Sequence, residues 1–122
     1  MEKKILIVED EVSLLNVLSE KLKLEGFEVL EAKNGEEGLD LALKRKPDLI
    51  LLDIIMPKMD GVTMLGNLRE NNWGKHVPVI ILTNLSSGSD ILKAVEKKAF
   101  SYLIKSDWKL EDVVKKIKKA LR

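Results

Sequence analysis

The chain has 122 residues, the length of one ordinary domain with a single core, and its 21 basic and 20 acidic residues leave a formal charge of +1. That balance supplies no field toward nucleic acid or an anionic membrane, and the absence of cysteine excludes disulfides, thiolate metal sites and a cysteine nucleophile. Because the charged start Met1-Glu2-Lys3-Lys4 is unlike a signal peptide and no apolar stretch approaches the ~20 residues of a membrane span, we expect a cytoplasmic protein that does not bind membranes.

Short apolar runs alternate along the chain with longer stretches of helical period. The runs predict strands over residues 5–8, 29–32, 49–52, 79–82 and 102–104, and turn residues such as Gly26, Pro47 and Pro78 lie between the elements. Apolar residues at helical spacing predict five helices with these buried stripes: Leu14, Val17, Leu18 and Leu22; Leu39, Leu41 and Leu43; Leu65 and Leu68; Ile91, Leu92 and Val95; and Leu110, Val113, Val114, Ile117 and Leu121.

The order of these elements predicts an α/β fold. Continuous apolar strands are typical of a parallel sheet that is covered on both faces. Strict alternation of five strands with five helices requires right-handed crossovers and gives a doubly wound sheet with helices on both sides. Since no linker, repeat or low-complexity segment interrupts the pattern, we predict one domain over residues 1–122.

Carboxylates follow two of the predicted strands. Glu9, Asp10 and Glu11 come directly after the first strand, and Asp53 comes directly after the third. The C-terminal ends of parallel strands meet at one edge of the sheet, which is where open α/β sheets bind ligands. Like charges at such close quarters repel, so the arrangement persists mainly where a cation offsets it. Oxygen ligands with no His or Cys nearby suit a hard ion, and we therefore predict a Mg²⁺ site.

These and other motifs together resemble the receiver domain of two-component response regulators. The matching segments are Ile5-Leu6-Ile7-Val8-Glu9-Asp10-Glu11, Asp53-Ile54-Ile55-Met56-Pro57-Lys58-Met59-Asp60-Gly61, Thr83 after the fourth strand, and Tyr102-Leu103-Ile104-Lys105. The resemblance runs from Lys4 to about Leu121 and leaves no room for a fused effector domain. It implies a flavodoxin-like fold, a five-stranded parallel sheet of order 2-1-3-4-5.

The resemblance also implies a chemical role for the acidic cluster. Asp53 would accept a phosphoryl group from a histidine kinase or a histidine phosphotransfer protein. Mg²⁺ would be bound by Glu9, Asp10, Asp53 and the backbone carbonyl of Ile55. Such a domain is a signalling switch and not an enzyme in the ordinary sense, because it catalyses only its own phosphoryl transfer and dephosphorylation.

Three further residues would read the phosphorylated state. Thr83 and Lys105 would contact the phosphoryl oxygens, and movement of Thr83 would vacate space that Tyr102 can fill. The resemblance implies output through the face formed by the fourth helix, the fifth strand and the fifth helix. We expect a downstream protein partner there, no direct DNA binding, and either a monomer or a phosphorylation-dependent dimer.

Three departures from the family pattern bear directly on the site. Glu9 stands where aspartate is commoner, Asn84 follows Thr83 where alanine or glycine is usual, and Ile55 offers an attacking water no polar group. These departures leave open a receiver-like interaction module that no longer accepts phosphate. An aspartate-based Mg²⁺ phosphatase would need a second acid where Ile55 stands. In a flavodoxin-type electron carrier, the acidic residues after the first strand would repel the cofactor phosphate.

Three local features complete the expectations. The stripe assigned to the first helix leaves Leu15 off the buried face, so we predict an exposed leucine that contacts the kinase. The pair Asp60-Gly61 is expected to form the turn that admits the third helix. His76 is expected to be exposed and chemically inert.

Overall fold

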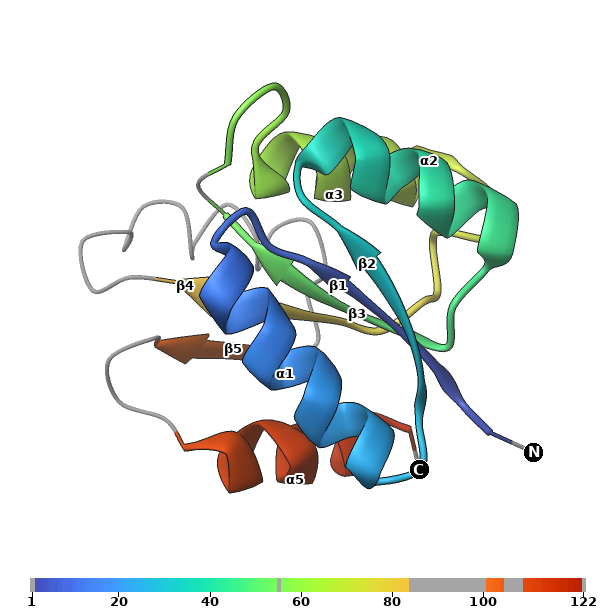
Figure 1. Cartoon of the computed structure of the whole chain (residues 1–122). Helices are drawn as coiled ribbons and strands as arrows, with labels where there is room; N and C mark the ends of the chain where they lie inside the picture. The colour runs from blue at the N-terminus through green and yellow to red at the C-terminus, as the bar shows by residue number, and fades with distance from the viewer. Residues whose placement is uncertain (1, 55, 84–100, 105–108, 122) are drawn as a thin grey trace.

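The computed structural model describes residues 2–54, 56–83, 101–104 and 109–121. Within these ranges strands alternate with helices along the chain (Figure 1). In chain order the elements are β1 (Lys4–Val8), α1 (Val12–Leu24), β2 (Glu28–Ala32), α2 (Gly35–Arg45), β3 (Leu49–Asp53), α3 (Gly61–Glu70), β4 (Val79–Thr83), β5 (Ser101–Ile104) and α5 (Leu110–Ala120).

The five strands form one parallel sheet in the order β2-β1-β3-β4-β5. Each strand extends its predicted range by one residue at one end. The doubly wound, flavodoxin-like fold is therefore confirmed, with β1 at the point where the strand order reverses. The helix expected around Ile91, Leu92 and Val95 lies outside the described residues.

Helices cover both faces of the sheet, and each face has its own apolar core (Figure 1). Along β1, Leu6 and Val8 belong to the core shared with α2 and α3, while Ile5 and Ile7 belong to the core shared with α1 and α5. Because side chains alternate across a strand, only a continuous apolar run can fill both cores at once. This is the physical reason that the sequence predicts the inner strands β1, β3 and β4, whereas the edge strand β2 contains the exposed Glu31.

Helix α1 is buried through a different stripe from the one predicted. The buried residues are Leu15, Leu18, Ser19 and Leu22, and Leu15 is 1% exposed whereas Val17 is 47% exposed. Both stripes contain Leu18 and Leu22 and both have helical spacing, so the sequence pattern alone is compatible with two different buried faces for this helix. Because Ser19 is polar, an apolar pattern could not identify the buried face on which it lies. The prediction that Leu15 is an exposed docking residue is therefore wrong.

Helix α2 is also buried differently, because small residues form its inner face. Gly35, Gly38 and Ala42 are buried, whereas Leu43 is 37% exposed. A Cβ atom at Gly38 would lie 2.8 Å from a methyl group of Val8 and 3.2 Å from the sulfur of Met64. Only a residue without a side chain permits so close an approach. The predicted stripe of Leu39, Leu41 and Leu43 therefore lies on the flank of this helix and not on its buried face.

The remaining described helices follow the prediction. Leu65 and Leu68 are buried in α3, and Val113, Val114 and Ile117 are buried in α5. In the described part of the chain no helix combines the length and apolar character that a membrane span requires.

Candidate functional site

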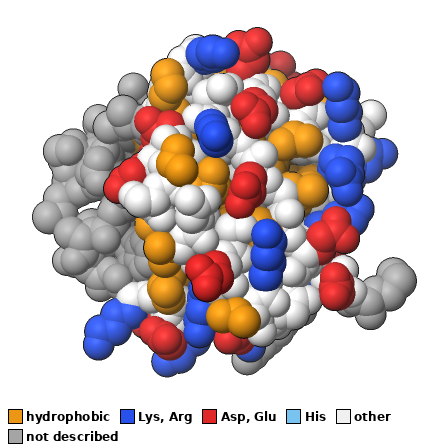
Figure 2. Space-filling view, in the orientation of Figure 1, with side chains coloured by type: hydrophobic (Ala, Val, Ile, Leu, Met, Phe, Trp, Pro, Cys, Tyr) orange, Lys and Arg blue, Asp and Glu red, His pale blue; other side chains and the backbone are white. Residues whose placement is uncertain are grey.

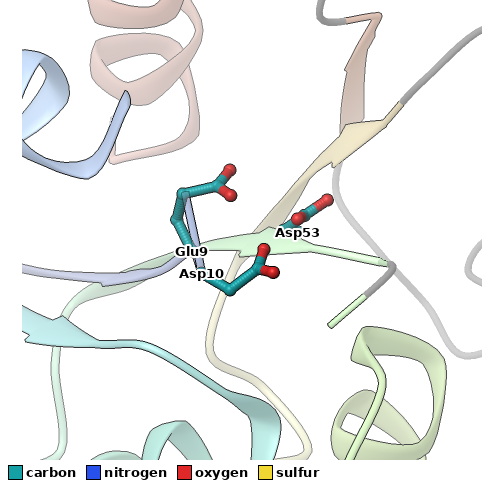
Figure 3. Close-up of side chains that lie close together, drawn as sticks. All are labelled: Glu9, Asp10 and Asp53. Atoms are coloured by element: carbon teal, nitrogen blue, oxygen red, sulfur yellow. The ribbon is translucent and has the colours of Figure 1, made fainter. Parts of the chain in front are cut away.

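The acidic residues predicted from the sequence come together at one edge of the sheet. Strands β1 and β3 are neighbours, with Val8 in register with Leu52, so the residues that end them lie side by side. Carboxylate oxygens of Glu9, Asp10 and Asp53 all lie within 4.8 Å of one another. Figure 3 shows the three carboxylates surrounding a common space beyond the strand ends. The predicted clustering is confirmed for these three residues.

The three carboxylates differ in burial, and this difference gives the cluster an open side. Glu9 is 0% exposed and Asp53 is 4% exposed, whereas Asp10 is exposed. The Glu11 backbone N–H donates to Glu9 Oε2 at 3.0 Å, and the Glu9 N–H donates to the Ala32 carbonyl at 3.0 Å. The Glu9 side chain is thus held by the backbone beside it. A ligand would approach from the side of Asp10.

The donor set fits a hard divalent cation. Carboxylate oxygens at this mutual spacing are the ligands that Mg²⁺ takes in proteins, and this ion usually keeps several waters. Burying carboxylates is costly unless opposite charge or hydrogen bonds compensate. Two buried carboxylates beside an exposed one therefore form a site whose charge a cation would balance and whose exposed side leaves room for its waters.

A tight turn after β3 positions the Asp53 peptide. The Gly61 N–H donates to the Ile54 carbonyl at 2.7 Å, and a Cβ atom at Gly61 would lie 2.2 Å from the Asp53 carbonyl oxygen. Asp60 caps helix α3, because its Oδ1 accepts from the Thr63 N–H at 2.8 Å. The structural role predicted for Asp60-Gly61 is confirmed. Any side chain at position 61 would push against the backbone of Asp53.

The other predicted site residues belong to β4, β5 and the segments around them. In the sheet register Asp53 pairs with Leu82, and Thr83 pairs with Ile104, so the backbone of Thr83 lies at the same sheet edge as Asp53. Tyr102 is in register with Ile81. Ile55 and Lys105 lie outside the described residues, as does Asn84. The roles of these residues stay predictions.

Two exposed valines of α1 were not predicted from the sequence. Val12, the first residue of α1, is 50% exposed and directly follows the acidic segment, and Val17 is exposed farther along the same helix. Both valines are exposed because α1 is buried through Leu15, Leu18, Ser19 and Leu22. The sequence signal for this buried face was the small residue Ser19, four positions after Leu15. His76, in contrast, is exposed as predicted.

Comparison with known proteins agrees with this fold. The family model for the response regulator receiver domain matches residues 5–118. The chain is 38% identical over 105 residues to the alkaline phosphatase synthesis transcriptional regulatory protein PhoP of Bacillus subtilis, which covers 86% of this chain and 43% of that protein. It is 33% identical over 119 residues to the DNA-binding dual master transcriptional regulator RpaA of Synechocystis, covering 98% of this chain and 49% of that protein. The chain thus spans less than half the length of these curated relatives.

A solved structure gives the same assignment. The receiver domain protein of Methanospirillum hungatei, described as CheY-like, superposes with a TM-score of 0.92 at 29% identity, covering 99% of this chain and 94% of that one. The motifs, the sheet order and the family match are mutually consistent. The chain belongs to the response regulator receiver domain family.

Proposed function

We propose that this chain is a phosphorylation-dependent signalling switch whose Asp53 accepts a phosphoryl group in a Mg²⁺-dependent reaction. The observation that carries the proposal is the convergence of Glu9, Asp10 and Asp53 within 4.8 Å at the carboxyl edge of the sheet. Asp53 ends the central strand β3 and is the residue of this cluster that matches the phosphoacceptor position of the family motif. The donor would be a phosphohistidine of a kinase or of a phosphotransfer protein.

The transfer is one displacement at phosphorus. An Asp53 carboxylate oxygen forms a bond to phosphorus while the bond from phosphorus to the histidine nitrogen of the donor breaks. A carboxylate is a weak nucleophile, so the site must contribute alignment and charge neutralisation rather than a general base. Burial of Asp53 and the close turn at Gly61 support such an alignment.

The charge of the site is the main obstacle to the reaction. Glu9 and Asp10 add two carboxylates beside the attacking Asp53, and the incoming phosphoryl group is also anionic. Mg²⁺, held by these carboxylates with the Ile55 carbonyl, would supply the positive charge that offsets this repulsion. Lys105 and the Thr83 hydroxyl would donate to the phosphoryl oxygens of the product, which accept strong charge-assisted hydrogen bonds. The same groups would serve the dephosphorylation of Asp53.

The output of the switch passes through protein surfaces. Contacts of Thr83 and Lys105 that exist only in the phosphorylated state would bias a two-state equilibrium, with Tyr102 following Thr83. The readout face would comprise the fourth helix, β5 and α5, and a downstream protein or a second copy of the chain would bind there. The relatives named as transcriptional regulators extend well beyond the part that this chain matches. We therefore propose no direct DNA binding for the receiver fold of this chain.

The proposal is tested by intact-mass measurement after incubation with a small acyl-phosphate donor. The parent should gain one phosphoryl group with Mg²⁺ and none with a chelator, and Asp53→Asn should gain none. Asp60→Asn is the matched control, because asparagine caps a helix as well as aspartate and the residue lies in the same loop. Equal labelling of Asp53→Asn and the parent would refute the assignment, and no labelling of the parent would favour a docking module.

A further inference from the structure

A surface groove lies between α2 and the loop that joins β3 to α3. One wall is the first turns of α2, the other is the loop segment with Lys58 and Met59, and the groove is lined entirely by described residues. Its apolar lining residues are Leu39, Leu43 and Met59. Figure 2 shows apolar and acidic side chains side by side over the part of the surface where Figure 1 places α2.

The two walls of the groove are joined by short contacts. The Gly35 N–H donates to the Met59 carbonyl at 3.0 Å, and a Cβ atom at Gly35 would lie 2.1 Å from that oxygen. The Asn67 side chain approaches the Met59 sulfur at 3.9 Å. Lys58 adopts a left-handed backbone with φ of 66°, a conformation that costs a residue with a side chain free energy. The contacts with Gly35 and Asn67 fix the position of Met59 beside α2.

The charges around the groove select the kind of occupant. Three acidic residues, Glu36, Glu37 and Asp40, line it against a single lysine, Lys58. The side chain of Asp40 is paired with Lys44 at 3.1 Å, whereas Glu36 and Glu37 are exposed in the first turn of α2. Such a rim repels nucleic acid and anionic membranes and attracts a basic segment.

The α5 helix of a second copy of this chain is a poor match for the groove. Its lysine-rich helix α5 has the required charge, but Val113, Val114 and Ile117 of that helix are buried in its own core. No apolar side chain of that buried face is available to enter the groove of a neighbour. The acidic rim and apolar lining of the groove therefore favour a partner protein segment with basic residues around an exposed apolar one.

We propose that this groove docks an amphipathic helix of a partner protein, with one or two apolar side chains against Leu39, Leu43 and Met59 and lysine or arginine residues beside Glu36 and Glu37. The groove lies on the α2 and α3 side of the sheet, away from the α5 face and from the exposed residues of α1. It is thus a separate surface from the output face proposed above.

Binding at this groove is coupled to the phosphorylation site through the loop that forms its wall. The loop begins directly after Asp53 and ends at Gly61, whose backbone is packed against the Asp53 carbonyl. A shift of the Asp53 peptide on phosphorylation would move Met59, and with it one wall of the groove. This coupling rests on the proposed function, whereas docking itself does not.

The test is a two-dimensional NMR titration of the full chain with a synthetic helical peptide of lysines that carries leucines at i, i+3 and i+7. Saturable shifts should map to α2 and to Lys58 and Met59. Leu43→Asn should weaken binding at least about tenfold, since an apolar contact is lost. Glu36→Gln with Glu37→Gln should weaken it about threefold, as expected for exposed charges. Leu24→Asn, on α1, is the matched control and should leave the affinity unchanged.

Three results would overturn docking at this groove: shifts centred on α1 or α5, equal affinity of the Leu43→Asn variant, or equal binding of a peptide with glutamates in place of the lysines. The coupling is tested by repeating the titration with Mg²⁺ and beryllofluoride, which should change the affinity at least about twofold in the parent but not in Asp53→Asn. Docking without such a change would remove the coupling and leave the docking site in place.

Discussion

Helices α1 and α2 cover opposite faces of the same sheet, and they are buried in different ways. α1 fills the space above the sheet with Leu15, Leu18 and Leu22, whereas α2 is buried through Gly35, Gly38 and Ala42. The small residues allow the backbone of α2 to contact the loop that follows Asp53, and α1 makes its apolar core contacts with large leucine side chains. From this difference we infer that α2 is placed to follow movements of the loop after Asp53, and we expect the exposed apolar residues of α1, Val12 and Val17, to contact a partner.

The largest predicted effect is on the free energy of unfolding, and it depends on which face of α1 is buried. Leu15→Ala should lower the free energy of unfolding by about 3 kcal/mol, because a fully buried leucine leaves a cavity. Val17→Ala, two residues away, should change it by less than about 0.5 kcal/mol, since Val17 is 47% exposed and lies outside the core. Urea unfolding followed by circular dichroism measures both. Equal losses for the two variants would contradict the assigned phase.

The close packing of α2 gives the next effect. Gly35→Ala should destabilise the protein by about 2 kcal/mol, because the added methyl group meets a backbone carbonyl that cannot rotate away. Gly26→Ala is the control: its φ of 93° is strained for alanine, but nothing lies within 4 Å of the new atom. Its cost should stay near 1 kcal/mol. A Gly35 variant as stable as the parent would show that α2 and the loop are not tightly joined.

The exposed side of α1 should matter for the kinase and not for stability. Val17→Asn is expected to slow phosphoryl transfer from a phosphorylated histidine kinase about tenfold, since an apolar contact with the partner is lost. Labelling by a small acyl-phosphate donor should not change. Leu43→Asn on α2 is the control and should transfer at the parent rate. Loss of both activities in the Val17 variant would point to the site itself instead of the docking surface.

The smallest effect is a pH dependence of the contact between α1 and α5. Lys118 approaches Glu25 at 3.1 Å and Lys21 does so at 3.5 Å, while Glu111 lies 3.8 Å from Lys21. The hydrogen bond and charge of Lys118, then those of Lys21, lower the pKa of Glu25 below its ordinary value of 4.5. A lowered carboxyl pKa contributes stability that is present above pH 4.5 and is lost as the pH falls through the folded-state value.

This pH effect is isolated by comparing the parent with Glu25→Gln. The difference in unfolding free energy between the two should shrink as the pH is lowered from neutral to below 4.5. Because the groups are exposed, the difference should also shrink at high salt. A difference that stays constant over this range would show that the ion pairs with Glu25 contribute nothing to stability.

The strands and the acidic cluster could be predicted because each rests on a short local pattern. An apolar run that serves two cores cannot be polar at any position, and carboxylates directly after parallel strands must share an edge. The buried faces of the helices were harder to predict from the sequence. Ser19 concealed the stripe of α1, and in α2 the decisive residues were glycine and alanine, which carry almost no hydrophobic signal. The α2 groove could not be predicted either, since it depends on Met59 meeting Gly35 across the sheet edge.

The central claim is that Asp53 is the residue that carries the phosphoryl group. After labelling with a small acyl-phosphate donor and Mg²⁺, borohydride reduction converts an aspartyl phosphate to homoserine, and peptide mass spectrometry then locates it. Conversion is predicted at Asp53 alone, with Asp10, Asp60 and Glu9 unaltered. Conversion at another carboxylate, with Asp53 intact, would contradict the claim and assign the acceptor elsewhere.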